Sequence, residues 1–237
     1  TRARKDDLTN LCNYIMDNAP PDSIGIVDTM GCATPEAIKY MVRWVTDMTG
    51  LPIEIHTHND FGMGVATELA AVTAGAVCVH SCANGLGERT GNAALEELMM
   101  GLHLLYGYDT DYKLDKIPEL AAMIAEKSNI PIARNKPVLG HGNFIRESGI
   151  GINYVMNDPL VMFATHPSLT GKIGEVVLGK KSGKASIIYK MGEMGLGEVD
   201  DDKIALILNE VKATGIAKRD VLSNEEFANI VAAVKAK

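Results

Sequence analysis

Short apolar segments alternate with longer amphipathic ones, and this alternation limits the fold more than any other feature of the sequence. The apolar segments indicate three buried strands, at residues 23–27, 52–58 and 77–82. Helical periodicity is expected at residues 4–18, 34–48, 63–74 and 92–106. Strands and helices that alternate with short links favour an α/β fold with a parallel sheet covered by helices.

The second half of the chain has a different pattern. Residues 130–151 are rich in Asn, Gly and Pro and read as a loop, so a domain boundary is predicted near Asn129. Two helices are expected near the end, at residues 201–214 and 223–237. Ser223 caps the last of them, with Glu226 in the reciprocal position of a capping box.

Composition and charge exclude several classes of protein. The chain has 237 residues, 46% hydrophobic and 22% charged, which is typical of a soluble globular protein. A net charge of −7 gives no general attraction to nucleic acid. The sequence has no apolar run of about 18 residues, so no membrane span is predicted. Four cysteines in a chain of this size do not indicate a disulfide framework, so we expect a cytoplasmic protein with reduced thiols.

Polar residues follow each predicted strand. They lie at residues 28–29, 56–60 and 84–92. In parallel α/β folds the carboxyl ends of the strands form one edge, where ligands bind. We therefore expect these three polar clusters to form a single site.

The cluster after the second strand contains a histidine pair. Side chains alternate along a strand, so Glu54, His56 and His58 share one face. Two imidazoles about 7 Å apart along a strand are suited to hold one metal ion. The alternatives are two hydrogen-bonded structural histidines, or a general base with a neighbour.

The other two clusters are less specific. Three glycines at residues 85–91 allow tight turns before a helix N-terminus, and Asn92 could complete a shell of oxygen and nitrogen ligands. Glu88 and Arg89 are polar enough for a functional role, but an ordinary turn with an exposed salt bridge is the alternative. Thr29 could donate a hydrogen bond to a substrate carboxylate, although a simple strand end before an N-cap at Thr34 is favoured.

Three motifs in order carry a resemblance to a known family. They are D-T-M-G-C-A-T-P, H-T-H-N-D-F-G-M-G-V-A and N-G-L-G-E-R-T-G-N-A-A-L-E-E. Together they resemble the DRE-TIM metallolyase family, and more narrowly its acetyl-CoA-dependent condensing branch of isopropylmalate, homocitrate and citramalate synthases. The resemblance continues through P-I-A-R-N-K-P-V-L-G and L-G-K-K-S-G-K, to about residue 188.

The resemblance implies a TIM (β/α)8 barrel that binds one divalent cation (Mg, Mn or Zn). His56 and His58 would be metal ligands, with Asn92 as a further or water-mediated one. Thr29 would hold the carboxylate of a 2-oxo acid. The loop that contains Asn84, Gly85 and Gly87 would help to bind acetyl-CoA. The implied activity is that of a transferase of amino-acid biosynthesis, which condenses acetyl-CoA with a 2-oxo acid to give a 2-hydroxy dicarboxylic or tricarboxylic acid.

Only three strands of the barrel are expected in this chain. The predicted domains are a partial barrel with the last three strands at 1–128, a linker or lid at 129–190, and a small helical subdomain at 191–237. The family's first strand supplies an acidic metal ligand that this chain lacks. We therefore expect the missing N-terminal barrel half to come from another segment or chain, and little activity without it.

The lid differs from the family pattern. Condensing enzymes carry S-G-I-H there and a tyrosine further on, whereas this chain has Gly151 after Ser148-Gly149-Ile150. Tyr154 and His166 lie nearby as possible substitutes, so the predicted catalytic residues are these two with Glu88 and Arg89. Lid exchange in the family implies a homodimer.

Two other functions remain open at this stage. One is a lyase of the same superfamily that cleaves a hydroxyacyl-CoA, although its usual cysteine-containing glycine loop is not found in G-E-R-T-G-N. The other is a non-catalytic subunit that has kept the barrel fold.

Overall fold

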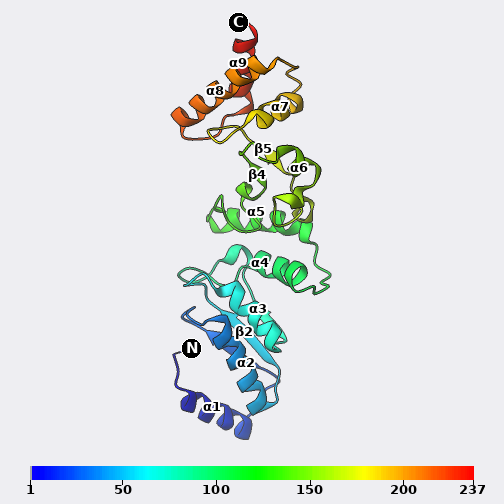
Figure 1. The fold of residues 1–237 in the computed structure, drawn as a ribbon. Coiled ribbons are helices and arrows are strands. Elements are labelled where there is room, and N and C mark those ends of the chain that lie inside the picture. Colours follow the sequence, from blue (N-terminus) through cyan, green and yellow to red (C-terminus); the bar gives the residue numbers. More distant parts are fainter. Residues whose placement is uncertain (1) are drawn as a thin grey trace. The chain divides into compact units, whose positions relative to one another are not determined.

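The computed structural model describes residues 2–237, apart from the side chains of Asn153 and Met156. The chain divides into two compact units, the first ending at Leu139 and the second beginning at Gly140 (Figure 1). The helices and strands of the first unit are α1 (Lys5–Asn18), β1 (Ile24–Asp28), α2 (Pro35–Thr49), β2 (Ile53–Thr57), α3 (Gly64–Ala74), β3 (Cys78–His80), α4 (Leu95–Met100) and α5 (Ile117–Ser128). The predicted three-part division at residues 128 and 190 stays a prediction.

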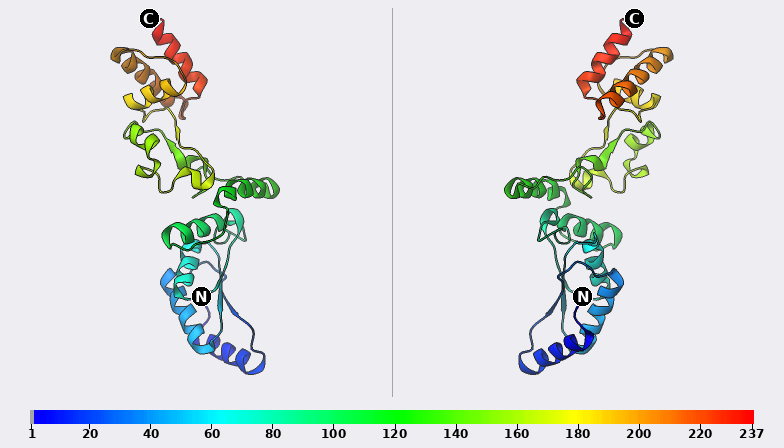
Figure 2. Two further views of the ribbon diagram at one scale, coloured as in Figure 1. Left: turned by 90° about the vertical axis from the view of Figure 1, so that its right-hand side faces the viewer. Right: turned by 90° about the vertical axis from the view of Figure 1, so that its left-hand side faces the viewer.

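The three strands form a parallel sheet in the order β1-β2-β3. Helices α2 and α3 pack together along one side of these strands (Figure 2). Fully buried Ile38 and Val42 of α2 meet Ile53 and Ile55 of β2 in this core. The alternation along β2 turns the histidine face away from the two helices, so that face carries the half-buried His56.

The predicted helix signals are confirmed in α2. The Thr34 hydroxyl accepts a hydrogen bond from the Ala37 N–H at 3.2 Å, and Pro35 begins the helix. Gly50 ends it in the left-handed conformation, with φ at 67°, which glycine adopts without steric cost. The predicted strands also occur. β1 has the expected length and is shifted by one residue, whereas β2 and β3 are shorter than expected.

The helix predicted at residues 92–106 is only partly correct. Asn92 pairs with His58 and Ala94 with Cys82 in isolated β-bridges. These extended residues delay the start of α4 to Leu95. After Met100 the helix continues as a π-helix, Gly101–Leu105.

The second unit is mainly helical. It contains a two-stranded parallel pair, β4 (Ile145–Arg146) and β5 (Glu175–Val176), and the helices α6 (Ile152–Asn157), α7 (Lys184–Glu193), α8 (Asp201–Lys218) and α9 (Asn224–Lys235). Its core joins α7, α8 and α9 through Ile187, Ile207 and Phe227. The capping box of Ser223 and Glu226 is confirmed.

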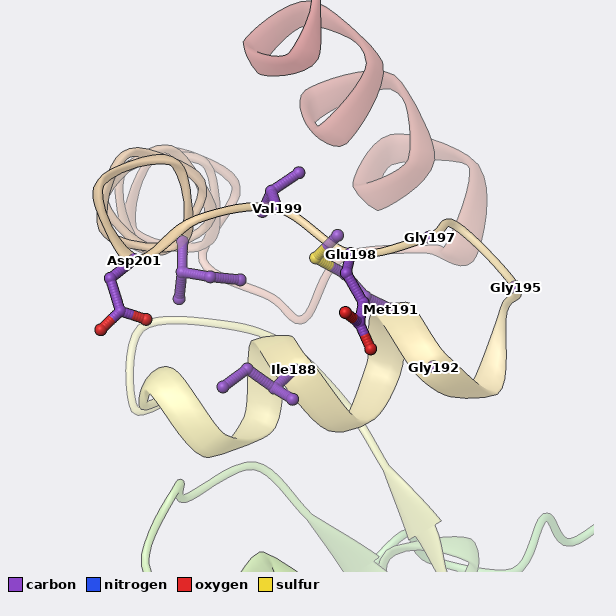
Figure 3. A pocket seen from close by; sticks show the side chains of 9 residues that line it. Ile188, Met191, Gly192, Gly195, Gly197, Glu198, Val199 and Asp201 are labelled. Carbon is purple, nitrogen blue, oxygen red and sulfur yellow. The ribbon is translucent and has the colours of Figure 1, made fainter.

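A pocket opens beside α7 in this unit. Ile188 and Met191 of α7 line it, together with a glycine-rich turn and Glu198 ahead of α8 (Figure 3). None of the predicted site residues lies in its lining. Among residues 2–237, no helix has both the length and the apolar character needed to cross a bilayer.

Glu68 of α3 connects this helix to Thr57, the last residue of β2. Its side chain is fully buried, and its Oε1 accepts the Thr57 N–H at 3.1 Å. The Thr57 hydroxyl lies 3.1 Å from the same oxygen and 3.0 Å from the Gly64 carbonyl. Burial raises the pKa of Glu68 to about 8, so the carboxyl group is mainly protonated at neutral pH.

This burial makes folding stability depend on pH. The folded pKa of about 8 exceeds the ordinary value of 4.5, so the stabilising effect of the protonated group is complete below pH 4.5 and is lost as the pH rises to about 8. Over this range we expect the free energy of unfolding of the wild-type chain to fall by about 1.4 kcal/mol per pH unit. Glu68→Gln should not show this fall, because glutamine keeps the carbonyl acceptor but cannot ionise. Urea unfolding between about pH 5 and pH 8 measures it. Glu36→Gln, which changes an exposed carboxyl group on α2, is the control. If unfolding free energy depends on pH in Glu68→Gln as steeply as in the wild-type chain, the prediction is wrong.

Candidate metal centre

The two predicted metal-ligating histidines lie side by side. The ring centroids of His56 and His58 are 5.2 Å apart, with their planes at 83°. Burial lowers the pKa of His56, and the neighbouring His58 and His80 lower it further. The His56 ring is therefore neutral at neutral pH, which leaves one ring nitrogen with a lone pair for a cation.

Backbone pairing brings Asn92 to His58. The two residues form an antiparallel bridge. On either side of it, the Asn59 N–H donates to the Gly91 carbonyl at 2.9 Å and the Ala93 N–H to the Thr57 carbonyl at 3.2 Å. Directly opposed residues in such a pair have neighbouring side chains. An amide from the loop after β3 thus stands next to an imidazole from the end of β2.

Two polar atoms in this place lack partners. In the described part of the chain, neither Nδ1 of His58 nor Oδ1 of Asn92 has a hydrogen bond, although both atoms are buried. The Asn92 amide nitrogen is used, because it donates to Cys82 Sγ at 3.2 Å and to the Leu86 carbonyl at 3.4 Å. A buried polar atom without a partner costs about 1–3 kcal/mol. An imidazole nitrogen and an amide oxygen left in this state fit the ligand set of a divalent cation.

Glycines allow the loop before Asn92 to fold so tightly. A Cβ on Gly91 would lie 1.8 Å from the Gly85 carbonyl oxygen, and one on Gly87 would lie 2.6 Å from the Asn92 amide nitrogen. Asn84 has φ at 60° and anchors the start of the loop. Its N–H donates to Glu96 Oε2 and its side-chain amide to the Ala121 carbonyl, at 3.0 and 2.9 Å.

Arg89 joins the three polar clusters. Its guanidinium donates to both carboxylate oxygens of Asp60, at 2.9 and 3.0 Å, and to the Thr29 carbonyl at 2.6 Å. The bidentate pair lowers the pKa of Asp60. Arg89 therefore ties together the loops after β1, β2 and β3, as expected if the three carboxyl ends form one edge. These hydrogen bonds give Arg89 a role in positioning the three loops. Its predicted catalytic role stays a prediction.

The other predicted site residues fall into two groups. Thr29 and Glu88 lie at the same edge and are exposed, and Glu88 is paired with Arg89 at 3.5 Å. Tyr154 and His166 belong to the second unit, so a shared site with the first unit stays a prediction. Tyr154 is 71% exposed on α6, while His166 Nδ1 lies 2.7 Å from the Ser168 hydroxyl at the start of a short 3-10 helix.

Three residues beside the histidine pair were not among the predicted site residues. Glu54, Cys78 and His80 lie on the same sheet face as His56. The alternation along β2 places Glu54 on the same face as His56. Which residues of β3 lie opposite these two depends on the register between β2 and β3, and the sequence does not give that register.

Comparisons with known proteins identify the family of this chain. The HMGL-like family matches residues 1–124, more than half of the chain. The (R)-citramalate synthase of Methanocaldococcus jannaschii is 36% identical over 82% of this chain and 39% of its own length. The homocitrate synthase of Methanopyrus kandleri is 38% identical over 82% and 49%. The 2-isopropylmalate synthase of M. jannaschii is 37% identical over 93% and 44%.

The chain therefore spans about two fifths to one half of the length of these relatives. Among solved structures, the HMG-CoA lyase of Bacillus subtilis matches 58% of this chain and 48% of its own chain, with a TM-score of 0.51 and 24% identity. That likeness concerns the fold alone. The family match confirms the resemblance inferred from the three motifs: the chain belongs to the HMGL-like, or DRE-TIM, family.

Proposed function

We propose that this chain is the C-terminal part of a divalent-metal-dependent synthase that condenses acetyl-CoA with a 2-oxo acid. The observation that carries the proposal is a pair of buried atoms, His58 Nδ1 and Asn92 Oδ1, that have no hydrogen-bond partner among the described residues. Three relatives with different names, a citramalate, a homocitrate and an isopropylmalate synthase, support the reaction class and leave the 2-oxo acid open.

The metal would be held by His56, His58 and Asn92. When bound, a cation supplies Lewis-acid polarisation of a keto oxygen and electrostatic stabilisation of the developing oxyanion. The protein prepares for this in two ways. Burial keeps His56 neutral and ready to ligate, and Cys82 and Leu86 orient the Asn92 amide so that its oxygen is left for a ligand.

The proposal also assigns residues that bind the substrates. Thr29 would donate its hydroxyl to the carboxylate of the 2-oxo acid. Its position is fixed because its own carbonyl accepts from Arg89. The loop with Asn84, Gly85 and Gly87 would border acetyl-CoA, and its folded shape is set by the Glu96 and Ala121 contacts of Asn84.

The condensation itself needs acid and base groups. A base takes a proton from the acetyl methyl group, the resulting enolate carbon attacks the keto carbon, and the keto oxygen then receives a proton. Water afterwards cleaves the thioester and releases the thiol. We propose Glu88 of the first unit as one of these groups, and the roles predicted for Tyr154 and His166 stay predictions. The first is at the strand edge and highly exposed, and the latter two are in the second unit.

The sheet supports the barrel part of the proposal. In the described part of the chain, α2 and α3 cover one face of three parallel strands. Parallel sheets are normally buried on both faces, and three strands cannot close a barrel. We infer that residues 1–128 form the last three strands of a (β/α)8 barrel, completed by an N-terminal half from another segment or chain, and that the whole works as a homodimer.

Metal binding can be tested on the chain itself. We expect His58→Ala and Asn92→Ala to weaken Mn²⁺ binding at least tenfold, because each removes a donor atom from the centre. Electron paramagnetic resonance of free Mn²⁺ measures the affinity without any need for activity. His103→Ala, in the π-helix after α4, is the matched histidine control. Equal affinity in all four proteins would exclude the centre.

The reaction class is tested by thiol release from acetyl-CoA with a panel of 2-oxo acids. The assay uses the purified chain together with any polypeptide that co-purifies with it. We expect release with at least one 2-oxo acid, its loss on chelation, and its reduction by more than a hundredfold in His56→Ala. Cleavage of a hydroxyacyl-CoA without condensation would instead favour a lyase.

A further inference from the structure

A second group of metal-ligating side chains lies on the face of the sheet that carries the histidine pair. The register pairs Glu54 of β2 with Cys78 of β3, and His56 with His80. Residues that are paired on adjacent strands have side chains on the same face of the sheet, as do residues two positions before or after them. These side chains can contact one another. The ligand atoms of Glu54, Cys78 and His80 accordingly all lie within 4.8 Å of one another.

The Glu54 carboxylate is already oriented for such a role. Its Oε1 accepts the Ser23 hydroxyl at 2.7 Å, and its Oε2 lies 3.1 Å from His80 Nε2. Carboxylates that bind metals are commonly held by such outer hydrogen bonds, so the Ser23 contact orients Glu54 as a ligand.

We propose that Glu54, Cys78 and His80 form a second cation site, separate from the His56, His58 and Asn92 centre, for a divalent ion that accepts thiolate sulfur, such as Zn²⁺. On binding, the Cys78 thiol loses its proton to solvent and its sulfur bonds to the metal. Carboxylate, thiolate and neutral imidazole then carry two negative charges, which balance the ion.

The spacing agrees with this chemistry. Bonds of about 2.0–2.3 Å in a tetrahedral zinc site put neighbouring ligand atoms about 3.4–3.8 Å apart. Glu54 Oε2 and His80 Nε2, at 3.1 Å, are already slightly closer than this, and the Cys78 sulfur lies within 4.8 Å of the other two ligand atoms. Shifts of up to about 1 Å, which rotations of side chains can supply, would therefore bring the three atoms to this spacing. All three side chains are at least partly exposed in this unit, so such rotations meet little steric hindrance. Three protein ligands leave a fourth position for water.

The donor types separate the two sites. Imidazole and amide oxygen in the first site have no thiolate, whereas the second site combines sulfur, nitrogen and oxygen, which favours zinc and cobalt over magnesium and manganese. His56 lies next to both, since its ring centroid is 5.2 Å from that of His58 and 5.7 Å from that of His80. The test therefore has to identify the sulfur ligand.

Cobalt(II) titration provides this identification. Thiolate-to-cobalt charge transfer gives an absorption band in the near ultraviolet that imidazole and carboxylate ligands do not give. We expect the band in the wild-type chain, together with release of at least one proton per ion bound. It should be lost in Cys78→Ser and kept in Cys12→Ser, the control for another thiol of the same unit.

Two further variants separate this site from the proposed centre. We expect His58→Ala to keep the cobalt band, and Glu54→Gln to keep it with at least tenfold weaker affinity. Circular dichroism establishes that each variant is folded. A band that is missing in the wild-type chain, or that persists in Cys78→Ser, would overturn the second site without affecting the Mn²⁺ result. A band lost in His58→Ala would show that cobalt occupies one shared centre, and would overturn it as well.

Discussion

The backbone pairing of His58 with Asn92 is the interaction on which the candidate centre depends. It exists because the loop after β3 folds back on itself, and that fold has no room for a side chain at Gly91, where a Cβ would lie 1.8 Å from the Gly85 oxygen. Gly31 has a similar role after β1, since a Cβ there would lie 2.7 Å from the Asp60 backbone nitrogen. Close packing of three loops, rather than any single ligand, therefore brings the donor atoms to one edge.

Local signals in the sequence predict much of this arrangement. The cap at Thr34 and the glycine at position 50 define α2, because both act through their own backbone and need no distant partner. The alternation of β2 likewise places His56 and His58 on one face. Hydrophobic periodicity finds helices and strands for the same reason, since it records which side of each element is buried.

Contacts between elements could not be predicted in this way. The sequence predicts a functional role or an exposed salt bridge for Arg89, but it does not identify the partners Asp60 and Thr29, which are far from Arg89 in sequence. Glu68 reads as a polar position of a helix, yet it is fully buried against Thr57. Both outcomes depend on how α3 and the loops pack on the sheet. The helix expected from residue 92 also begins late, because tertiary bridges hold Asn92 and Ala94 extended.

Charge distinguishes the two donor sets on the sheet face. His56, His58 and Asn92 would offer neutral donors, so none of these three ligands would reduce the charge of a divalent ion that they hold. Under the proposed function, a 2-oxo acid would bring a carboxylate, and negative charge would develop on its keto oxygen during condensation. An ion whose charge is not cancelled by its ligands would stabilise both. Glu54 and a Cys78 thiolate would cancel the charge of an ion in the second set. A cation there would attract no anion, and it would act on the reaction only through His56, the residue between the two sets.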